Sequence, residues 1–486
     1  MVEREQINST KTKKLSMETS TDEKILTIAD FQKEFYLHAI SPVDGRYGNK
    51  TIKLNSVSSE YGLIYFRFWL EVYYLLEISI ELSLPLTDEE NKFILGLTES
   101  FSVKDALRIK EIELVTNHDL NSVVEYLKER LTEKGINEKV ISHVHFGLTS
   151  ADIDNIVRSL MLLEGEKTNL EVLISIDQSL KDFVETHKSD SMLARTHGQG
   201  ASPTTFGKEI EVFRYRLEKQ VEILTSFNLS VKFGGATGNM NAHYISYPNV
   251  NWIEFAKRFV SKLGAKERKW VYRSPATTQI DCYDSHAEYF AIYERINTIL
   301  IGFCQDIWRY ISDEWILQIP KEKEVGSSAM PHKINPIDFE NAEGNLGFAN
   351  AQFDFYIRKL PISRLQRDLS DSTVVRNFGM TLAYCLIGYQ SLSKGLKKIK
   401  PNPEKMLSVL NDNYAVVVEA IQTILRREGD TDAYNKLKDF SRGKKLNREM
   451  VAEFINNLNI KDDLKKELLQ ITPANYIGNA VQIAEG

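Results

Sequence analysis

The 486-residue sequence is poor in several features that define whole classes of protein. Its three cysteines, Cys282, Cys304 and Cys385, are widely spaced and form no CxxC pair, which argues against a disulfide framework and a cysteine-bound zinc site. No apolar run approaches the roughly 20 residues that a membrane-spanning helix needs. A net charge of −6 gives no general reason to expect nucleic acid or an anionic membrane as a partner.

The N-terminal stretch lacks the features of a targeting segment. "MVEREQINSTKTKKLSMETSTDEK" has neither the apolar centre of a secretory signal nor the acid-poor, Arg-rich character of a transit peptide. We therefore expect residues 1–30 to form a polar, disordered leader and the protein to be cytoplasmic.

Proline is also scarce, and its twelve positions leave long stretches free for helices. Apolar residues in 287–318 recur at alternating steps of four and three, which is the spacing of helices packed nearly parallel in a bundle. The residues of this stripe are Tyr289, Tyr293, Ile296, Leu300, Phe303, Ile307 and Tyr310. Other faces of the same segment carry Ile292, Ile299, Ile301 and Trp308, so we expect it to be buried on more than one side.

Strand signals are limited to short pieces such as "WVYR" at 270–273, so the sequence predicts an all-α fold. The length exceeds what one compact core can hold. We expect an N-terminal helical domain over 31–140, a central long-helix bundle over 141–396 and a C-terminal helical domain over 397–486.

The segment "GSSAMPHKINP", residues 326–336, interrupts this helical pattern. Two prolines within six positions exclude an ordinary helix interior. A serine here could act as a base only if Lys333 and nearby amides stabilised its alkoxide. From the residues alone, that is a demanding hypothesis.

His197 lies in a second polar break, "LARTHGQGASPTTFGKE" at 193–209. One interpretation is a helix–helix turn rich in glycine and serine. The other is an imidazole held at a helix end, where it titrates as a general acid or base. Metal chemistry is not favoured, because no HExxH or similar spacing joins the nine histidines.

Three further segments each have a structural and a functional interpretation. "TNHD" at 116–119 and "LTSADID" at 148–154 fit helix starts, where side chains cap the backbone or the positive helix end binds an anion. "RLQRDLSDSTVVRNFG" at 364–379 fits either a solvated face with internally paired charges or a site for a phosphate or carboxylate.

The segment 326–336 resembles the GSSxMPxKxNP signature loop of the fumarase/aspartase superfamily. Its "MPHK" and the ordered blocks "SPVDGRYGNKT", "TNHD", "RTHGQ", "GNMNAHYISYP", "TTQIDCYD", "QRDLSDSTVVRN" and "TPANYIG" are similar to the bacterial-type adenylosuccinate lyase branch. The resemblance covers roughly residues 38–486. One departure is Gly200, where relatives commonly have proline.

The resemblance implies three helical domains and a homotetramer whose central helices form a core of about twenty helices, with active sites shared between subunits. It implies elimination of fumarate from adenylosuccinate, giving AMP, and from succinylaminoimidazole carboxamide ribotide, giving the carboxamide ribotide of purine biosynthesis. No metal or organic cofactor is implied.

By the same resemblance, Ser327 matches the general base and His197 the general acid. Other positions match substrate-binding residues of the family: Arg46, Tyr47, Asn117, His118, Asp119, Thr149, Ser150, Gln279, Ser328, Lys333, Asn335, Arg367, Ser372 and Arg376. Two alternatives stay open. One is another fumarate-releasing lyase such as argininosuccinate lyase, against which the Arg and Ser block at 367–376 argues. The other is a non-catalytic structural tetramer, against which the presence of both His197 and Ser327 argues.

Overall fold

The computed structural model describes residues 35–264, 271–320, 330 and 332–486. The chain divides into two compact units, Met1–Gly48 and Asn49–Gly486. In the first unit, a turn is closed by two backbone hydrogen bonds: Gly45 N–H donates to the Ser41 carbonyl at 2.9 Å and Tyr47 N–H to the Pro42 carbonyl at 2.8 Å. The predicted leader, residues 1–30, lies outside the described residues.

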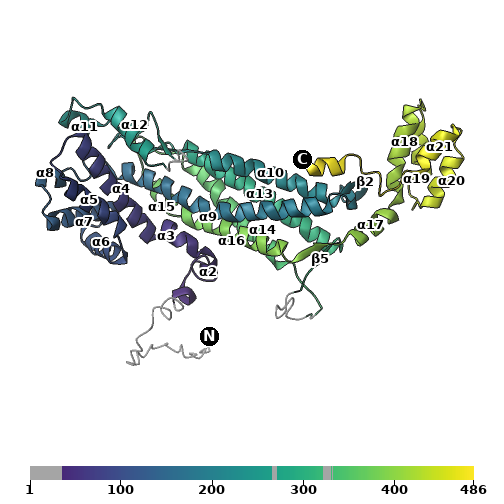
Figure 1. Ribbon diagram of the computed structural model, residues 1–486, viewed down its shortest axis with the longest axis horizontal. Coiled ribbons are helices and arrows are strands. Elements are labelled where there is room, and N and C mark those ends of the chain that lie inside the picture. The colour runs from purple at the N-terminus through teal and green to yellow at the C-terminus, as the bar shows by residue number, and fades with distance from the viewer. Residues whose placement is uncertain (1–34, 265–270, 321–329, 331) are drawn as a thin grey trace, which may run out of the picture. The chain divides into compact units, whose positions relative to one another are not determined.

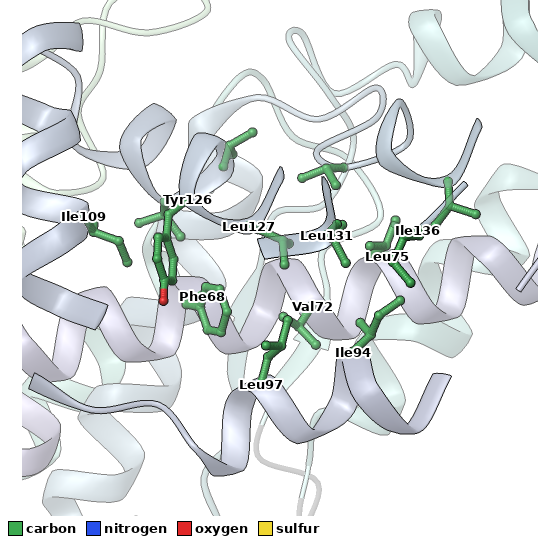
Figure 2. Packing of buried hydrophobic residues seen from close by; sticks show 14 of the residues in the cluster. Phe68, Val72, Leu75, Ile94, Leu97, Ile109, Tyr126, Leu127, Leu131 and Ile136 are labelled. Atoms are coloured by element: carbon green, nitrogen blue, oxygen red, sulfur yellow. The ribbon is translucent and has the colours of Figure 1, made fainter. Parts of the chain in front are cut away.

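Three short helices come first: α2 (Gly48–Thr51), η1 (Ile52–Leu54) and α3 (Asn55–Ser58). The next five helices, which pack around one hydrophobic core, are α4 (Glu60–Glu81), α5 (Asp88–Glu99), α6 (Val103–Thr116), α7 (Asp119–Lys134) and α8 (Glu138–Ile141). Figure 2 shows the core that α4 to α7 share, including Phe68, Val72, Leu75, Ile94, Leu97, Ile109, Tyr126, Leu127 and Leu131. This packing holds α7 in place, and the first residues of α7 line the cavity described below.

The centre of the second unit is a bundle of long helices (Figure 1). These are α9 (Ser150–His187), α10 (Phe206–Ser226), α13 (Asp284–Ser312), α14 (Ile337–Lys359) and α16 (Phe378–Leu396). Each helix contacts the next in the cyclic order α9, α10, α13, α14, α16, and α16 contacts α9 again. The mainly α-helical fold that the sequence predicts is confirmed.

The apolar stripe predicted in 287–318 lies along α13. Its six residues from Tyr289 to Ile307 are at most 1% exposed. Ile292 and Ile299, on another face, are also buried, as expected, but Trp308 is 46% exposed. The helix ends at Ser312, before the predicted stretch does, and the chain continues into a short strand.

The part of the chain that the structure describes also contains six short strands: β1 (Ser191–Thr196), β2 (Gln199–Thr205), β3 (Leu229–Val231), β4 (Val271–Arg273), β5 (Ile316–Gln318) and β6 (Ile399–Pro401). They form three two-stranded sheets, β1 with β2 and β5 with β6 antiparallel, and β3 with β4 parallel. β4 confirms the strand predicted from "WVYR" over the described residues 271–273.

The remaining elements are short. They are α11 (Asn241–Ser246), α12 (Trp252–Lys262), α15 (Ser370–Val375), α17 (Pro403–Asp412), η2 (Tyr414–Val417), α18 (Val418–Arg427), α19 (Ala433–Ser441), α20 (Arg448–Asn456), α21 (Asp462–Leu469) and α22 (Ala480–Glu485). The elements from η2 to α21 share a core of their own that includes Val417, Ile421, Leu437 and Ile455. Among the described helices, none is both long and apolar enough to cross a membrane.

Candidate active site

A cavity of about 230 Å³ lies where α7, α9 and the region around α15 meet. Its lining residues are Arg67, His118, Asp119, Ser150, Ala151, Asp154, Asn155, Arg158, Ile280, Tyr283, Arg367, Leu369, Asp371, Ser372, Val375 and Arg376. The N-terminal ends of α7 and α9 both contribute to it, and these helix ends carry partial positive charge. The volume is below the roughly 300–1,000 Å³ of a complete ligand pocket, so the cavity fits one part of a larger site.

Six residues predicted to bind substrate come together in this cavity. They are His118, Asp119, Ser150, Arg367, Ser372 and Arg376. Three other predicted residues stand next to lining residues. Asn117 ends α6 with a left-handed backbone, Thr149 caps α9, and Gln279 donates its N–H to the Gln366 carbonyl at 3.3 Å. Segments separated by up to about 250 positions in the sequence therefore meet at one place.

Arg67 and Arg376 hold Asp119 in the wall of the cavity. Arg67, which is 2% exposed, donates to Asp119 at 2.9 Å and to Asp154 at 2.8 Å, and Arg376 donates to Asp119 at 2.8 Å. Burial opposes ionisation of Asp119, but the Arg67 charge and the hydrogen bonds from both guanidiniums hold its pKa well below the usual range. Asp119 thus serves to orient two arginines.

The start of α7 is capped by an unexpected side chain. Within "TNHD", the capping side chain is His118, whose Nδ1 accepts the Asn121 N–H at 3.1 Å. Because Nδ1 accepts a hydrogen bond, the neutral ring carries its proton on Nε2. That nitrogen is available to donate to a ligand in the cavity.

The charges of the 364–379 segment are partly paired within it, as the sequence predicts. Arg364 lies 3.3 Å from Asp368, and Arg367 lies 3.8 Å from Asp371. Arg376 instead leaves the segment to pair with Asp119. Arg367 and Arg376 thus pair with carboxylates and also line the cavity.

A buried ion pair lies next to the cavity wall at the start of α9. Lys232 and Asp152 are both fully buried, with 2.6 Å between Nζ and Oδ1. Asp152 also accepts backbone N–H groups from Gly234 at 2.7 Å and Gly235 at 3.1 Å, and the backbone N–H of Thr149 at 2.8 Å. The pair thus ties the start of α9 to the loop after β3.

His243 lies next to this ion pair in the core and is 1% exposed. Its Nε2 lies 3.1 Å from the Tyr74 hydroxyl. Gly147, with φ of +69°, packs over the ring, and a Cβ there would come within 2.5 Å of the imidazole. Burial lowers the pKa of His243 to about 4.

This lowered pKa predicts a loss of stability in mild acid. Below about pH 6.5, His243 is protonated in the unfolded chain, whereas in the native protein it stays neutral down to about pH 4. The free energy of unfolding should therefore fall by about 3 kcal/mol from this group as the pH drops from 6.5 to 4, with no further loss below. Denaturant unfolding of wild type and His243→Gln, at one protein concentration, isolates this contribution because glutamine does not titrate. Equal pH dependence in both proteins would contradict it.

His197 occupies the tip of a β-hairpin, so the expectation of a helix end is wrong. β1 and β2 pair up to Thr196 and Gln199, and the two residues between them both have positive φ, +54° for His197 and +73° for Gly198. Two left-handed residues are typical of the turn that matches the twist of a hairpin. The imidazole is exposed at this tip.

Lys333 and Asn335 lie at the same end of the bundle as the hairpin. The segment after α13 joins them: Arg195 Nη2 lies 3.6 Å from Asp313 Oδ2, and Gln318 donates to the Ile334 carbonyl at 2.7 Å. The described part of 326–336, Met330 and 332–336, is not helical, as predicted, and α14 starts directly after it at Ile337. Lys333 is exposed and Asn335 is half-buried.

Within one chain, the cavity and the hairpin that carries His197 lie at opposite ends of α9. Ser150, in the cavity wall, is the first residue of this helix, and β1 follows soon after its last residue, His187. Its 38 residues span about 57 Å at 1.5 Å per residue. A single chain therefore holds the predicted residues in two separate groups.

Four predicted residues cannot be assigned to either group. Ser327 and Ser328 lie outside the described residues, and Arg46 and Tyr47 belong to the first unit, in the turn described above. Among the residues that the structure describes, no group of three or more His, Cys, Asp or Glu side chains is placed to hold a metal ion.

Sequence reasoning missed several cavity residues, notably Arg67, Asp154, Arg158, Tyr283 and Asp371. The clearest available signal was in "DIDNIVRSLMLL" at 152–163. There Asp154 and Arg158 are charged residues four positions apart within an apolar helix, and a charge in such a place needs a partner or a ligand.

Comparison with known proteins shows the family to which this chain belongs. A family model described as lyase matches residues 49–349, and one described as adenylosuccinate lyase C-terminal matches residues 363–477. Two solved structures share the fold at low identity. A fumarate lyase from Mesorhizobium sp. BNC1 has a TM-score of 0.70 and 17% identity, covering 89% of this chain and 96% of its own. A 3-carboxy-cis,cis-muconate lactonizing enzyme from Pseudomonas putida has a TM-score of 0.69 and 16% identity, covering 93% and 97%.

Curated relatives match over nearly the whole length at much higher identity. An adenylosuccinate lyase of Buchnera aphidicola is 45% identical over 92% of this chain and 98% of its own, and that of Dictyostelium discoideum is 46% identical over 91% and 97%. The Escherichia coli K12 adenylosuccinate lyase is 42% identical over 92% and 98%. This chain is a lyase and belongs to the adenylosuccinate lyase family.

Proposed function

We propose that this enzyme eliminates fumarate from adenylosuccinate to give AMP, and from succinylaminoimidazole carboxamide ribotide to give the carboxamide ribotide. The observation that carries the proposal is the meeting of His118, Ser150, Arg367, Ser372 and Arg376 in one cavity. Relatives more than 40% identical over nearly their whole length are named adenylosuccinate lyases, which supports the choice of substrate.

In the proposed reaction, the Ser327 alkoxide removes a proton from the carbon next to a substrate carboxylate. The electron pair left behind spreads onto that carboxylate, which Lys333 and Asn335 stabilise by charge and hydrogen bonds. The C–N bond then breaks, and the His197 imidazolium gives its proton to the leaving nitrogen. Fumarate and AMP are the products, and the proton balance closes on the two side chains.

We propose that Arg367, Ser372 and Arg376 bind the nucleotide and its phosphate, with Arg46 and Tyr47 as further contacts. Guanidinium groups suit this role because they offer two parallel donors to phosphate oxygens. Asn117, His118 and Asp119 would position the substrate, while Thr149, Ser150, Gln279 and Ser328 would line the succinyl group. The expected location in the cytoplasm stays a prediction.

We further propose that the active enzyme is a homotetramer with shared sites. The 38 residues of α9 separate His197, Lys333 and Asn335 from the cavity of the same chain, so a complete site needs more than one copy. The bundle also exposes large apolar side chains suited to burial between copies, among them Val212, Tyr215, Trp308, Phe348 and Phe355.

The direct test is the absorbance change when the purified protein is mixed with adenylosuccinate and, separately, with argininosuccinate. We expect turnover of the first and none of the second. Absence of turnover with adenylosuccinate would refute the proposal. Turnover of argininosuccinate alone would favour the other lyase of the superfamily.

Shared sites predict that two inactive variants rescue each other. His197→Ala removes the proton donor at one end of the bundle, and Ser372→Glu places a carboxylate in the anion-binding cavity at the other. After subunit exchange, mixed assemblies should contain some sites with both elements intact, and activity should return. The matched control mixes Ser372→Glu with Arg376→Met, which damage the same cavity in every chain and should give no rescue. Failure of the first mixture despite exchange shown by native mass spectrometry would contradict sharing.

A further inference from the structure

One arginine in the cavity wall has no hydrogen-bond or ion-pair partner among the described residues. Arg158, on α9, is 9% exposed, yet it makes no hydrogen bond or ion pair with any residue that the structure describes. Its Nε is buried without a hydrogen-bond partner. Leaving a guanidinium buried and unpaired is costly, because it gives up hydration without compensation.

The other charges around the cavity are already matched. Arg67 pairs with Asp119 and Asp154, Arg376 with Asp119, and Arg367 with Asp371. The cavity has four guanidiniums and three carboxylates in its wall, which leaves one uncompensated positive charge. Arg158 is the guanidinium that takes part in none of these ion pairs.

The surroundings of Arg158 favour an anion there. Burial lowers its pKa to about 10, Asp154 opposes that shift, and the nearby charges of Arg67 and Arg376 add to it. A bound anion would relieve the repulsion among these cations. The polar groups of Ser150, Asn155 and Ser372 line the same space and supply hydrogen-bond partners.

We propose that Arg158 binds the phosphate group of the nucleotide, as a further guanidinium beside Arg367 and Arg376. The choice of a phosphate rests on the function proposed above, in which Arg367, Ser372 and Arg376 are the phosphate contacts. A doubly charged phosphate offers three oxygens, enough for several guanidiniums to donate at once. Arg158 is thus a substrate-binding residue and takes no part in proton transfer.

Binding of inorganic phosphate to the full-length protein, measured by isothermal titration calorimetry, tests this without any need for turnover. Arg158→Met should raise the phosphate Kd by about 10- to 100-fold. Arg158→Lys keeps the charge but loses the planar guanidinium, so its Kd should lie between those of wild type and Arg158→Met. Arg108→Met is the control and should leave the Kd unchanged, since Arg108 is exposed on α6 and pairs with Glu111 on α6 and Glu129 on α7, outside the cavity.

A thermal-shift measurement separates ligand binding from a structural role. Without phosphate, Arg158→Met should unfold at the same temperature as wild type or higher, because the substitution removes an unpaired buried charge. With phosphate, wild type should gain stability and the variant should gain little. A large loss of stability in the absence of phosphate would show that Arg158 has a structural role and would overturn the inference.

Two further measurements show whether the phosphate assignment or the proposed function is wrong. Succinate, which mimics the other end of the substrate, should bind Arg158→Met as it binds wild type. An unchanged phosphate Kd, or equal weakening of succinate and phosphate, would overturn the phosphate assignment. If wild type binds phosphate through Arg158 but does not convert adenylosuccinate, the proposed function fails while the anion site stands. If it converts adenylosuccinate with a KM that Arg158→Met leaves unchanged, only the inference fails.

Discussion

Replacing His197 by asparagine is expected to lower kcat by about 10²- to 10⁴-fold, the usual contribution of a general acid. Asparagine is the sharper choice because it tolerates the left-handed backbone at the hairpin tip, where φ is +54°. The substitution therefore removes the proposed proton donor and keeps the turn. Steady-state kinetics with adenylosuccinate should show the loss in kcat, with KM changed far less.

The comparison with His197→Ala tests whether the backbone matters as well. Alanine should lose the same proton transfer and add some strain at the turn, so its kcat should be as low or lower. A His197→Asn enzyme with near-normal kcat would mean that His197 only shapes the hairpin. Ser327→Ala should lose activity on the same scale, whereas Ser261→Ala, an exposed serine on α12 bonded to its own helix, should not.

Breaking the buried pair of Asp152 and Lys232 is expected to cost about 3–5 kcal/mol of stability. Both side chains are fully buried, so either single substitution leaves the other group without its partner. Asp152→Asn also weakens the hold on the Gly234 and Gly235 amides. Denaturant unfolding at fixed protein concentration gives the free-energy change.

The double variant Asp152→Asn/Lys232→Met supplies the test of cause. With both charges gone, the loss should be smaller than the sum of the two single losses, because no unpaired charge stays buried. Lys257→Met is the matched control: Lys257 forms an exposed pair with Glu254, so this substitution should lower the free energy of unfolding by no more than about 1 kcal/mol. Simple additivity in the double variant would contradict the ion-pair explanation.

The helices could be predicted because their apolar residues repeat at a fixed spacing. Predicting the stripe from Tyr289 to Ile307 requires only the geometry of a helix, and the stripe lies buried along α13 as expected. The end of that helix was less predictable. Tyr310 continues the apolar spacing, but the chain turns at Glu314, where φ is +60°, and Trp315 N–H bonds back to the Tyr310 carbonyl.

Much of the cavity was predictable for another reason, since its residues sit in compact polar blocks such as "TNHD" and "QRDLSDSTVVRN". Arg67 and Arg158 were missed because each stands among apolar neighbours on a long helix, and its burial depends on which other helices pack around it. The hairpin at 191–205 escaped because Gly198, Gly200 and Pro203 indicate a turn, while its strand pairing depends on contacts that spacing does not reveal.

The length of α9 also has a consequence for how this enzyme behaves in a test tube. If the sites are shared as proposed, the two groups of site residues lie at opposite ends of a 38-residue helix in each chain, and a lone folded subunit would be an intact protein without a working site. Specific activity should then fall on dilution below the dissociation constant of the assembly, while helical content persists. Catalytic capacity would depend on protein concentration as well as on sequence.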